Sequence, residues 1–135
     1  MSGKAVIIHS LDHARAALAA AEACGVGVTL VSAKAAAGYA GAPWFAAVIE
    51  TARADHPQVA LRAVLDCGDK PGHVIGALHQ GLKAVRFTGH KAVAETLRGL
   101  AREYDAELLT GRVVALDLRD HPAPDAACRD WLSKD

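Results

Sequence analysis

Residues Ala63 to His90 read AVLDCGDKPGHVIGALHQGLKAVRFTGH, and this stretch decides the fold class. An apolar run ends in Asp66-Cys67-Gly68-Asp69, a segment with helical spacing follows, and a second apolar run ends in Thr88-Gly89-His90. Two strands joined through a helix by short connections form the β-α-β unit of a parallel sheet. Because parallel strands end at the same edge, the sequence predicts that these polar residues lie together.

The same alternation extends over most of the chain, and it predicts an α/β fold. The expected strands lie near residues 4–9, 27–32, 60–66, 84–88, 106–110 and 113–118, and the expected helices lie near 11–23, 43–55, 71–81 and 91–104. We expect residues 1–120 to form one domain. Residues 121–135 are expected to form a proline-stiffened linker and a short docking helix that carries Trp131.

Alternation within the strands separates two faces of the expected sheet. One face is apolar, whereas the other carries Arg62, Arg86 and Glu107 in mid-strand, where we expect Glu107 to pair with Arg86 or Arg62. Unpaired charges are costly to bury under helices. This favours helices mainly on one side of an open parallel sheet, as in a truncated (β/α) barrel, or half TIM barrel. The alternative is a flavodoxin-like doubly wound sheet with strand order 2-1-3-4-5.

Composition limits the classes of partner. The 135 residues include 15 basic and 15 acidic side chains without a long run of either sign, so nucleic-acid and membrane-surface binding have no electrostatic basis. Cys24, Cys67 and Cys128 are widely spaced and form neither a disulfide framework nor a zinc-ribbon pattern. The first residues turn polar after a short apolar stretch, so we expect no signal peptide, no membrane span and a cytoplasmic location.

From about Ile8 to Gly111, the order of motifs resembles that of class II (metal-dependent) fructose-bisphosphate and tagatose-bisphosphate aldolases. That family has a strand with a Ser-containing loop, a Tyr-x-Gly stretch, strands ending in Leu-Asp-His-Gly and Asp-Gly-Ser, and a Glu-Leu-Gly strand. The matching segments here are Ser32, Tyr39-Ala40-Gly41, Leu65-Asp66-Cys67-Gly68, Thr88-Gly89-His90 and Glu107-Leu108. The resemblance implies roughly the first five β/α units of a barrel.

The resemblance also implies a set of site residues. Asp66 matches the family's proton-transferring aspartate, and the substrate-contacting positions are Ser32, Gly68, Thr88, Gly89 and His90. A divalent metal such as zinc would be held by Cys67, which stands where the family has a histidine, and by Glu107. His9 or His90 would be the third ligand. A site without any cofactor is the alternative.

We therefore expect an aldolase-like protein that binds a small hydroxylated or phosphorylated carbonyl compound. Classical class II aldolase activity is not expected, because a zinc-binding histidine is replaced and later ligand-bearing strands have no counterpart in these 135 residues. One alternative is a metal-dependent carbon–carbon lyase completed by oligomerisation, and another is a non-catalytic assembly protein. A homodimer or larger homo-oligomer is expected, because an open half-barrel leaves edge strands unprotected.

Overall fold

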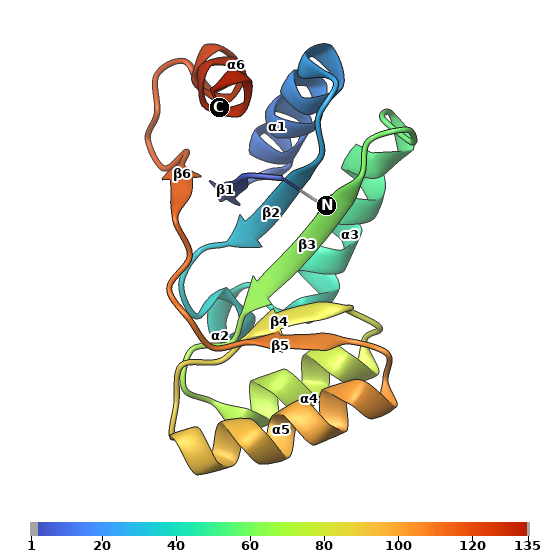
Figure 1. Ribbon diagram of the computed structural model, residues 1–135, viewed down its shortest axis with the longest axis vertical. Coiled ribbons are helices and arrows are strands. Elements are labelled where there is room, and N and C mark those ends of the chain that lie inside the picture. Colours follow the sequence, from blue (N-terminus) through green and yellow to red (C-terminus); the bar gives the residue numbers. More distant parts are fainter. Residues whose placement is uncertain (1–2, 135) are drawn as a thin grey trace. The chain divides into compact units, whose positions relative to one another are not determined.

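The computed structural model describes residues 3–134, and in this part of the chain strands and helices alternate as Figure 1 shows. The elements are β1 (Ala5–Ile8), α1 (Leu11–Cys24), β2 (Val28–Ser32), α2 (Ala36–Tyr39), α3 (Ala42–Ala54), β3 (Leu61–Asp66), α4 (Pro71–His79), β4 (Ala84–Arg86), α5 (Lys91–Glu103), β5 (Glu107–Leu109), β6 (Ala115–Asp117) and α6 (Pro124–Ser133).

The strands form an open parallel sheet in the order β5-β4-β3-β2-β1-β6. Strand β2 lies between β1 and the start of β3, because the Thr29 N–H donates to Lys4 O and the Val28 N–H donates to Ala60 O, both at 3.0 Å. The predicted α/β class with an open parallel sheet is confirmed. The order along the sheet is sequential from β1 to β5 and so differs from the 2-1-3-4-5 order of a flavodoxin-like sheet.

Contacts between Cα atoms divide the chain into two compact units. The first unit contains the chain up to Val31, the segment Ala47–Arg62 and the chain from Val113 onward. The second unit contains Ser32–Ala46 and Ala63–Arg112. Strands β2 and β3 are divided between the two units.

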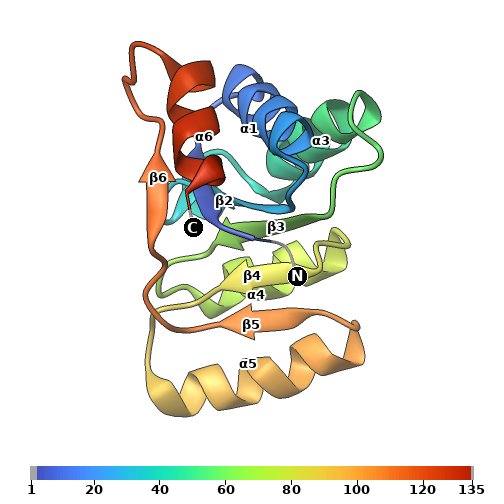
Figure 2. The same ribbon diagram turned by 45° about the horizontal axis from the view of Figure 1, so that its top comes forward.

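In the first unit, the C-terminal helix α6 packs against α1, as Figure 2 shows, and β6 pairs with β1. The face that α1 buries consists largely of alanine, and small side chains allow close helix approach. The Trp131 indole Nε1–H donates to Ala5 O at 2.9 Å, and Lys4 Nζ lies 5.0 Å from the centre of the same indole ring. These contacts fasten the tail helix to the first strand.

In the second unit, α4 and α5 lie side by side against β4 and β5 (Figure 1). Apolar side chains of both helices, such as Val74 and Leu97, are buried together with Val85 and Phe87. Arg86 lies between Val85 and Phe87 in the chain, so its side chain belongs to the opposite face of the strand. The alternation of apolar and polar positions thus separates two faces in this unit, as the sequence predicts.

The connection at residues 33–42, between β2 and α3, contains the short helix α2 at Ala36–Tyr39. Ala35 precedes this helix with a left-handed backbone (φ 56°), which is uncommon for a residue with a side chain. Alanine has the highest helix propensity, so an alanine-rich connection forms a helical turn once its start is fixed.

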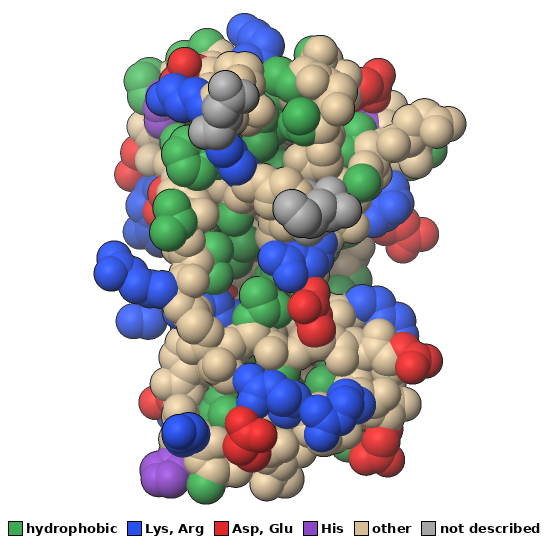
Figure 3. Space-filling model, viewed as in Figure 1, with side chains coloured by type: hydrophobic (Ala, Val, Ile, Leu, Met, Phe, Trp, Pro, Cys, Tyr) green, Lys and Arg blue, Asp and Glu red, His purple; other side chains and the backbone are tan. Residues whose placement is uncertain are grey.

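The surface in Figure 3 shows basic and acidic side chains interspersed, in keeping with a net charge of zero. Within residues 3–134, no helix is both long and apolar enough to cross a membrane.

Candidate functional site

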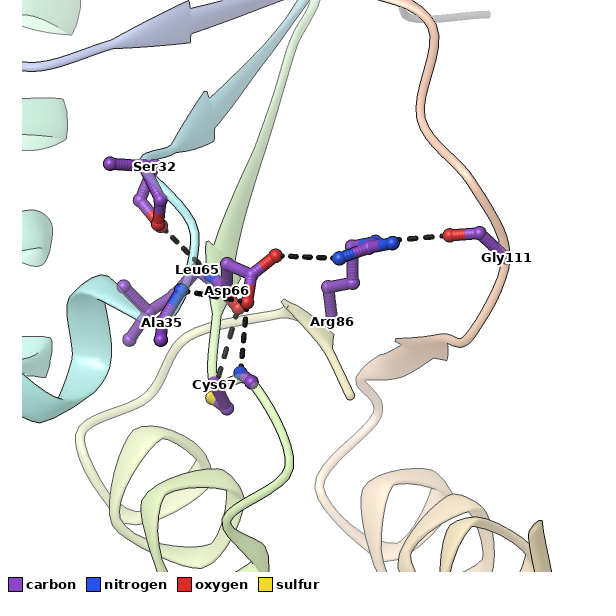
Figure 4. A network of polar contacts seen from close by, with 9 residues as sticks. Ser32, Ala35, Leu65, Asp66, Cys67, Arg86 and Gly111 are labelled. Carbon is purple, nitrogen blue, oxygen red and sulfur yellow. Dashed lines mark hydrogen bonds and ion pairs between the residues drawn. The ribbon is translucent and has the colours of Figure 1, made fainter. Parts of the chain in front are cut away.

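Asp66 is the centre of a buried polar network at the carboxyl end of β3 (Figure 4). Its side chain is only 5% exposed. Oδ1 accepts the backbone N–H of Ala35 at 3.0 Å and that of Gly68 at 2.8 Å, whereas Oδ2 accepts from Arg86 Nη1 at 2.8 Å. The carboxylate therefore holds together the loop after β2, the turn after β3 and a side chain of β4.

Arg86 extends this network to the end of β5. Its guanidinium group donates through Nη1 to Asp66 and through Nε to Gly111 O at 3.0 Å. The Arg86 side chain is 16% exposed, so the ion pair is largely removed from water. Loss of either partner would destabilise the protein, because the remaining charge would stay buried. Asp66 is thus a carboxylate that contacts Arg86.

Ser32 joins the last residue of β2 to the same network. Its hydroxyl Oγ accepts the Asp66 backbone N–H at 2.8 Å and donates to Ala33 O at 3.1 Å. Gly68 has a φ of 58°, and a Cβ at this position would lie 3.1 Å from the Ala35 Cβ. Ser32, Asp66 and Gly68 are therefore brought together as predicted from the sequence, and all three are buried.

Cys67 and Glu107, the expected metal ligands, are not brought together. Cys67 follows Asp66, so it points to the other face of β3, where its side chain is completely buried. Burial raises the pKa of the Cys67 thiol to about 12, and the Asp66 charge adds to this effect. Glu107 is exposed and pairs in register with Ala84 at the start of β4, away from the carboxyl ends.

These positions do not fit a shared metal ion. The ligands of a zinc ion must converge on one point. Among residues 3–134, no three His, Cys, Asp or Glu side chains are close enough together to hold a metal ion.

A hollow of about 290 Å³, here named the α5 hollow, lies where β4 and β5 end and α5 begins. The Phe87 N–H donates to Leu109 O at 2.9 Å, so the parallel pairing continues to this edge and places the following threonines there. The hollow is lined by Phe87, Thr88, Gly89, Lys91, Ala94, Glu95, Arg98 and Thr110. It offers two cationic groups, two hydroxyls and one carboxylate.

The predicted positions Thr88, Gly89 and His90 divide between two roles. Thr88 and Gly89 line the α5 hollow. His90 is the N-cap of α5, where its Nδ1 accepts the Ala92 N–H at 3.1 Å. The imidazole thereby satisfies one of the backbone donors that a helix leaves unpaired at its start.

Lys91 and Arg98 line the α5 hollow, although the sequence predicts no role for them. Helical spacing contains a signal for both, because they are seven residues apart and therefore share a face of α5. Arg98 donates to Glu95 through Nη1 and approaches Thr110 Oγ1 through Nη2 at 3.4 Å. These contacts orient the guanidinium group toward the end of β5.

No protein-family model matches this chain, and no curated protein does so either. A functional assignment therefore depends on the chemistry of the strand ends.

Proposed function

We propose that the protein binds a small phosphorylated or hydroxylated carbonyl compound in the α5 hollow. The observation that carries this proposal is the convergence of Lys91, Arg98, Thr88 and Thr110 on one hollow at the carboxyl ends of two parallel strands. Ligands of parallel α/β proteins bind at this edge. The volume of about 290 Å³ is at the lower end of the range for small-molecule sites and suits a compound of a few carbon atoms.

The two cations match the charge of a phosphate group, and the threonine hydroxyls can donate to its oxygens or to a hydroxyl of the ligand. Gly89 lines the hollow without a side chain, and a Cβ at this position would meet the Phe87 ring. The order of motifs that resembles class II aldolases supports a carbonyl compound as the ligand. Asp66 and Ser32 do not contact the ligand in this proposal, because their polar atoms are engaged in the buried network after β2 and β3.

Isothermal titration calorimetry with dihydroxyacetone phosphate tests the proposal. Replacing both Lys91 and Arg98 by alanine should weaken binding by about 10- to 100-fold, which is the range for losing charge-assisted hydrogen bonds. The matched control is Arg102→Ala, which removes an exposed arginine of α5 outside the hollow. Equal affinity of the double variant and the wild-type protein would refute this site.

The proposal includes a lack of class II aldolase activity. Fructose 1,6-bisphosphate should not be cleaved when zinc or cobalt is added, since Cys67 and Glu107 do not share a metal-binding point. A coupled assay for the triose phosphate products measures this. Robust metal-dependent turnover would show that the protein is a lyase instead.

A further inference from the structure

A second hollow lies in the first unit, where β1 and β6 end. Its volume is about 480 Å³, and it is lined by His9, Ser10, His13, Arg119, Asp120 and His121. We name it the β1–β6 hollow. All six lining residues have polar side chains, and none of them belongs to the α5 hollow.

A carboxylate–imidazole pair stands at this site. His9 Nε2 lies 2.6 Å from Asp117 Oδ1, and the same oxygen accepts the Arg119 backbone N–H at 2.9 Å. The pKa of Asp117 is lowered even though desolvation opposes this, because the Arg119 N–H and His9 stabilise the carboxylate. An ionised Asp117 accepts a hydrogen bond from the Nε2–H of His9, which leaves Nδ1 of the neutral imidazole as a hydrogen-bond acceptor.

The other two imidazoles are held in the opposite way. His13 Nδ1 accepts the His9 N–H at 3.0 Å, and His121 Nδ1 accepts the Ala123 N–H at 3.2 Å. In their neutral forms both rings therefore carry the proton on Nε2 and are hydrogen-bond donors there. The hollow thus combines one imidazole acceptor with two imidazole donors.

Charge selects the kind of ligand. Arg119 contributes a guanidinium group, whose planar donors suit carboxylate or phosphate oxygens, and the Ser10 hydroxyl adds a donor. Asp120 also lines the hollow and weakens the attraction for an anion. A simple anion is therefore less suited to this site than an anion that also bears a hydroxyl group, because the hydroxyl can donate to His9 Nδ1.

We propose that the β1–β6 hollow binds a small hydroxylated oxyanion, with its oxyanion on Arg119 and its hydroxyl on His9, which Asp117 orients. The oxyanion can be a carboxylate, as in a 2-hydroxy acid, or a phosphate, as in a phosphorylated alcohol. His13 and His121 donate to the remaining oxygens of the ligand. This inference is independent of the function proposed for the α5 hollow.

Imidazole ¹H–¹⁵N NMR spectra at pH 7.5 test the proposal with glycolate, acetate and glycerol 3-phosphate as probes. Glycolate should shift the signals of His9, His13 and His121, and it should bind about 2- to 10-fold more tightly than acetate, which lacks the hydroxyl. Glycerol 3-phosphate distinguishes phosphate from carboxylate as the preferred oxyanion. Arg119→Ala should weaken glycolate binding by about tenfold or more, while Arg129→Ala on α6 should leave it unchanged.

Asp117→Asn tests the role of His9, because it removes the carboxylate that places the proton on Nε2. In this variant glycolate and acetate should bind with about equal affinity, because acetate binding persists and the advantage of glycolate is lost. The proposal is overturned if wild-type protein binds glycolate and acetate equally, or if Arg119→Ala binds glycolate as tightly as wild type. It is also overturned if ligand-induced shifts are confined to histidines outside the β1–β6 hollow.

Discussion

Asp66 and Asp117 each stand at the carboxyl end of a strand, yet their surroundings differ. Asp66 is almost fully buried and accepts from two backbone N–H groups and one guanidinium group, all from the second unit. Asp117 is half exposed, and its imidazole partner His9 lines a hollow in the first unit. A carboxylate at a strand end can thus hold loops in place or orient a side chain toward a ligand. It holds loops where it and its partners are buried, as at Asp66, and it can orient a side chain where its partner lines a hollow, as at Asp117.

The largest expected effect is that of Asp66→Ala. This change leaves the Arg86 charge and two backbone N–H groups without their acceptor in a buried place, so we expect a loss of about 3–5 kcal/mol in the free energy of unfolding. Urea unfolding followed by circular dichroism measures it. The control is Asp69→Ala, an exposed carboxylate three residues on, which should change stability by less than about 0.5 kcal/mol.

Wild-type stability of Asp66→Ala would contradict a structural role for Asp66. If the variant then also loses dihydroxyacetone phosphate binding, Asp66 acts as a ligand contact and not as a structural residue.

Gly89→Ala should have the next largest effect. A Cβ on Gly89 would lie 2.4 Å from Cζ of the completely buried Phe87, so the ring or the backbone must shift. Overpacking of this kind costs about 1–3 kcal/mol, and here it also distorts the wall of the α5 hollow. The same substitution at Gly72, where a Cβ would meet no atom within 4 Å, should be neutral or slightly stabilising. Thermal and urea unfolding of the two variants measure this difference, and equal stability would contradict it.

The fold was predictable because each strand and helix has a local signal. Short apolar runs with polar ends alternate with alanine- and leucine-rich segments, and this pattern dictates a parallel α/β sheet. The neighbour of the last strand was not predictable in this way. Strand β6 pairs with β1, which is more than one hundred residues earlier in the chain, and nothing in the local sequence encodes that partner. The predicted homo-oligomer stays a prediction, which sedimentation velocity can check.

The candidate site was predictable as a set of strand ends, but the role of each residue was not. Asp66 and Thr88 both follow apolar runs, yet one is buried among hydrogen-bond donors and the other is exposed at a hollow. Exposure depends on which loops cover a strand end, and this is a property of the tertiary structure. For the same reason His13 and His121 gave no signal, since Asp117 and the β1–β6 pairing are needed to bring them to one place.

Glu95→Gln should have a smaller effect, which concerns ligand binding in the α5 hollow. Glu95 contacts Arg98 and is the one carboxylate lining this hollow, so it competes with a phosphate group for the guanidinium. Its neutralisation should strengthen dihydroxyacetone phosphate binding by about 1.5- to 5-fold, the range expected from a solvent-exposed ion pair. Calorimetry measures the gain, and Glu103→Gln, an exposed glutamate at the end of α5, is the control. Weaker binding by the Glu95 variant would place the ligand elsewhere.

The smallest expected effect is a pH dependence of stability caused by His13. Its pKa is lowered below the usual 6.5, first by desolvation and then by His9, while Asp12 and Asp117 oppose the shift. The unfolded chain therefore binds a proton at His13 at a higher pH than the folded protein does. The stabilisation from neutral His13 is complete above about pH 6.5 and is lost as the pH falls through the folded pKa.

His13→Gln isolates this contribution, because the other titrating groups are common to both proteins. The free energy of unfolding of wild type minus that of the variant should decrease steadily from pH 7.5 to pH 4.5 in urea titrations. Protonation of His13 removes the acceptor of the His9 N–H, so the imidazole signals of both residues should move together over the same pH range. A difference in unfolding free energy that grows as the pH falls would mean that the charged form of His13 is favoured in the folded protein. The β1–β6 hollow would then hold a cationic imidazole, and simple anions such as acetate would bind there as tightly as glycolate.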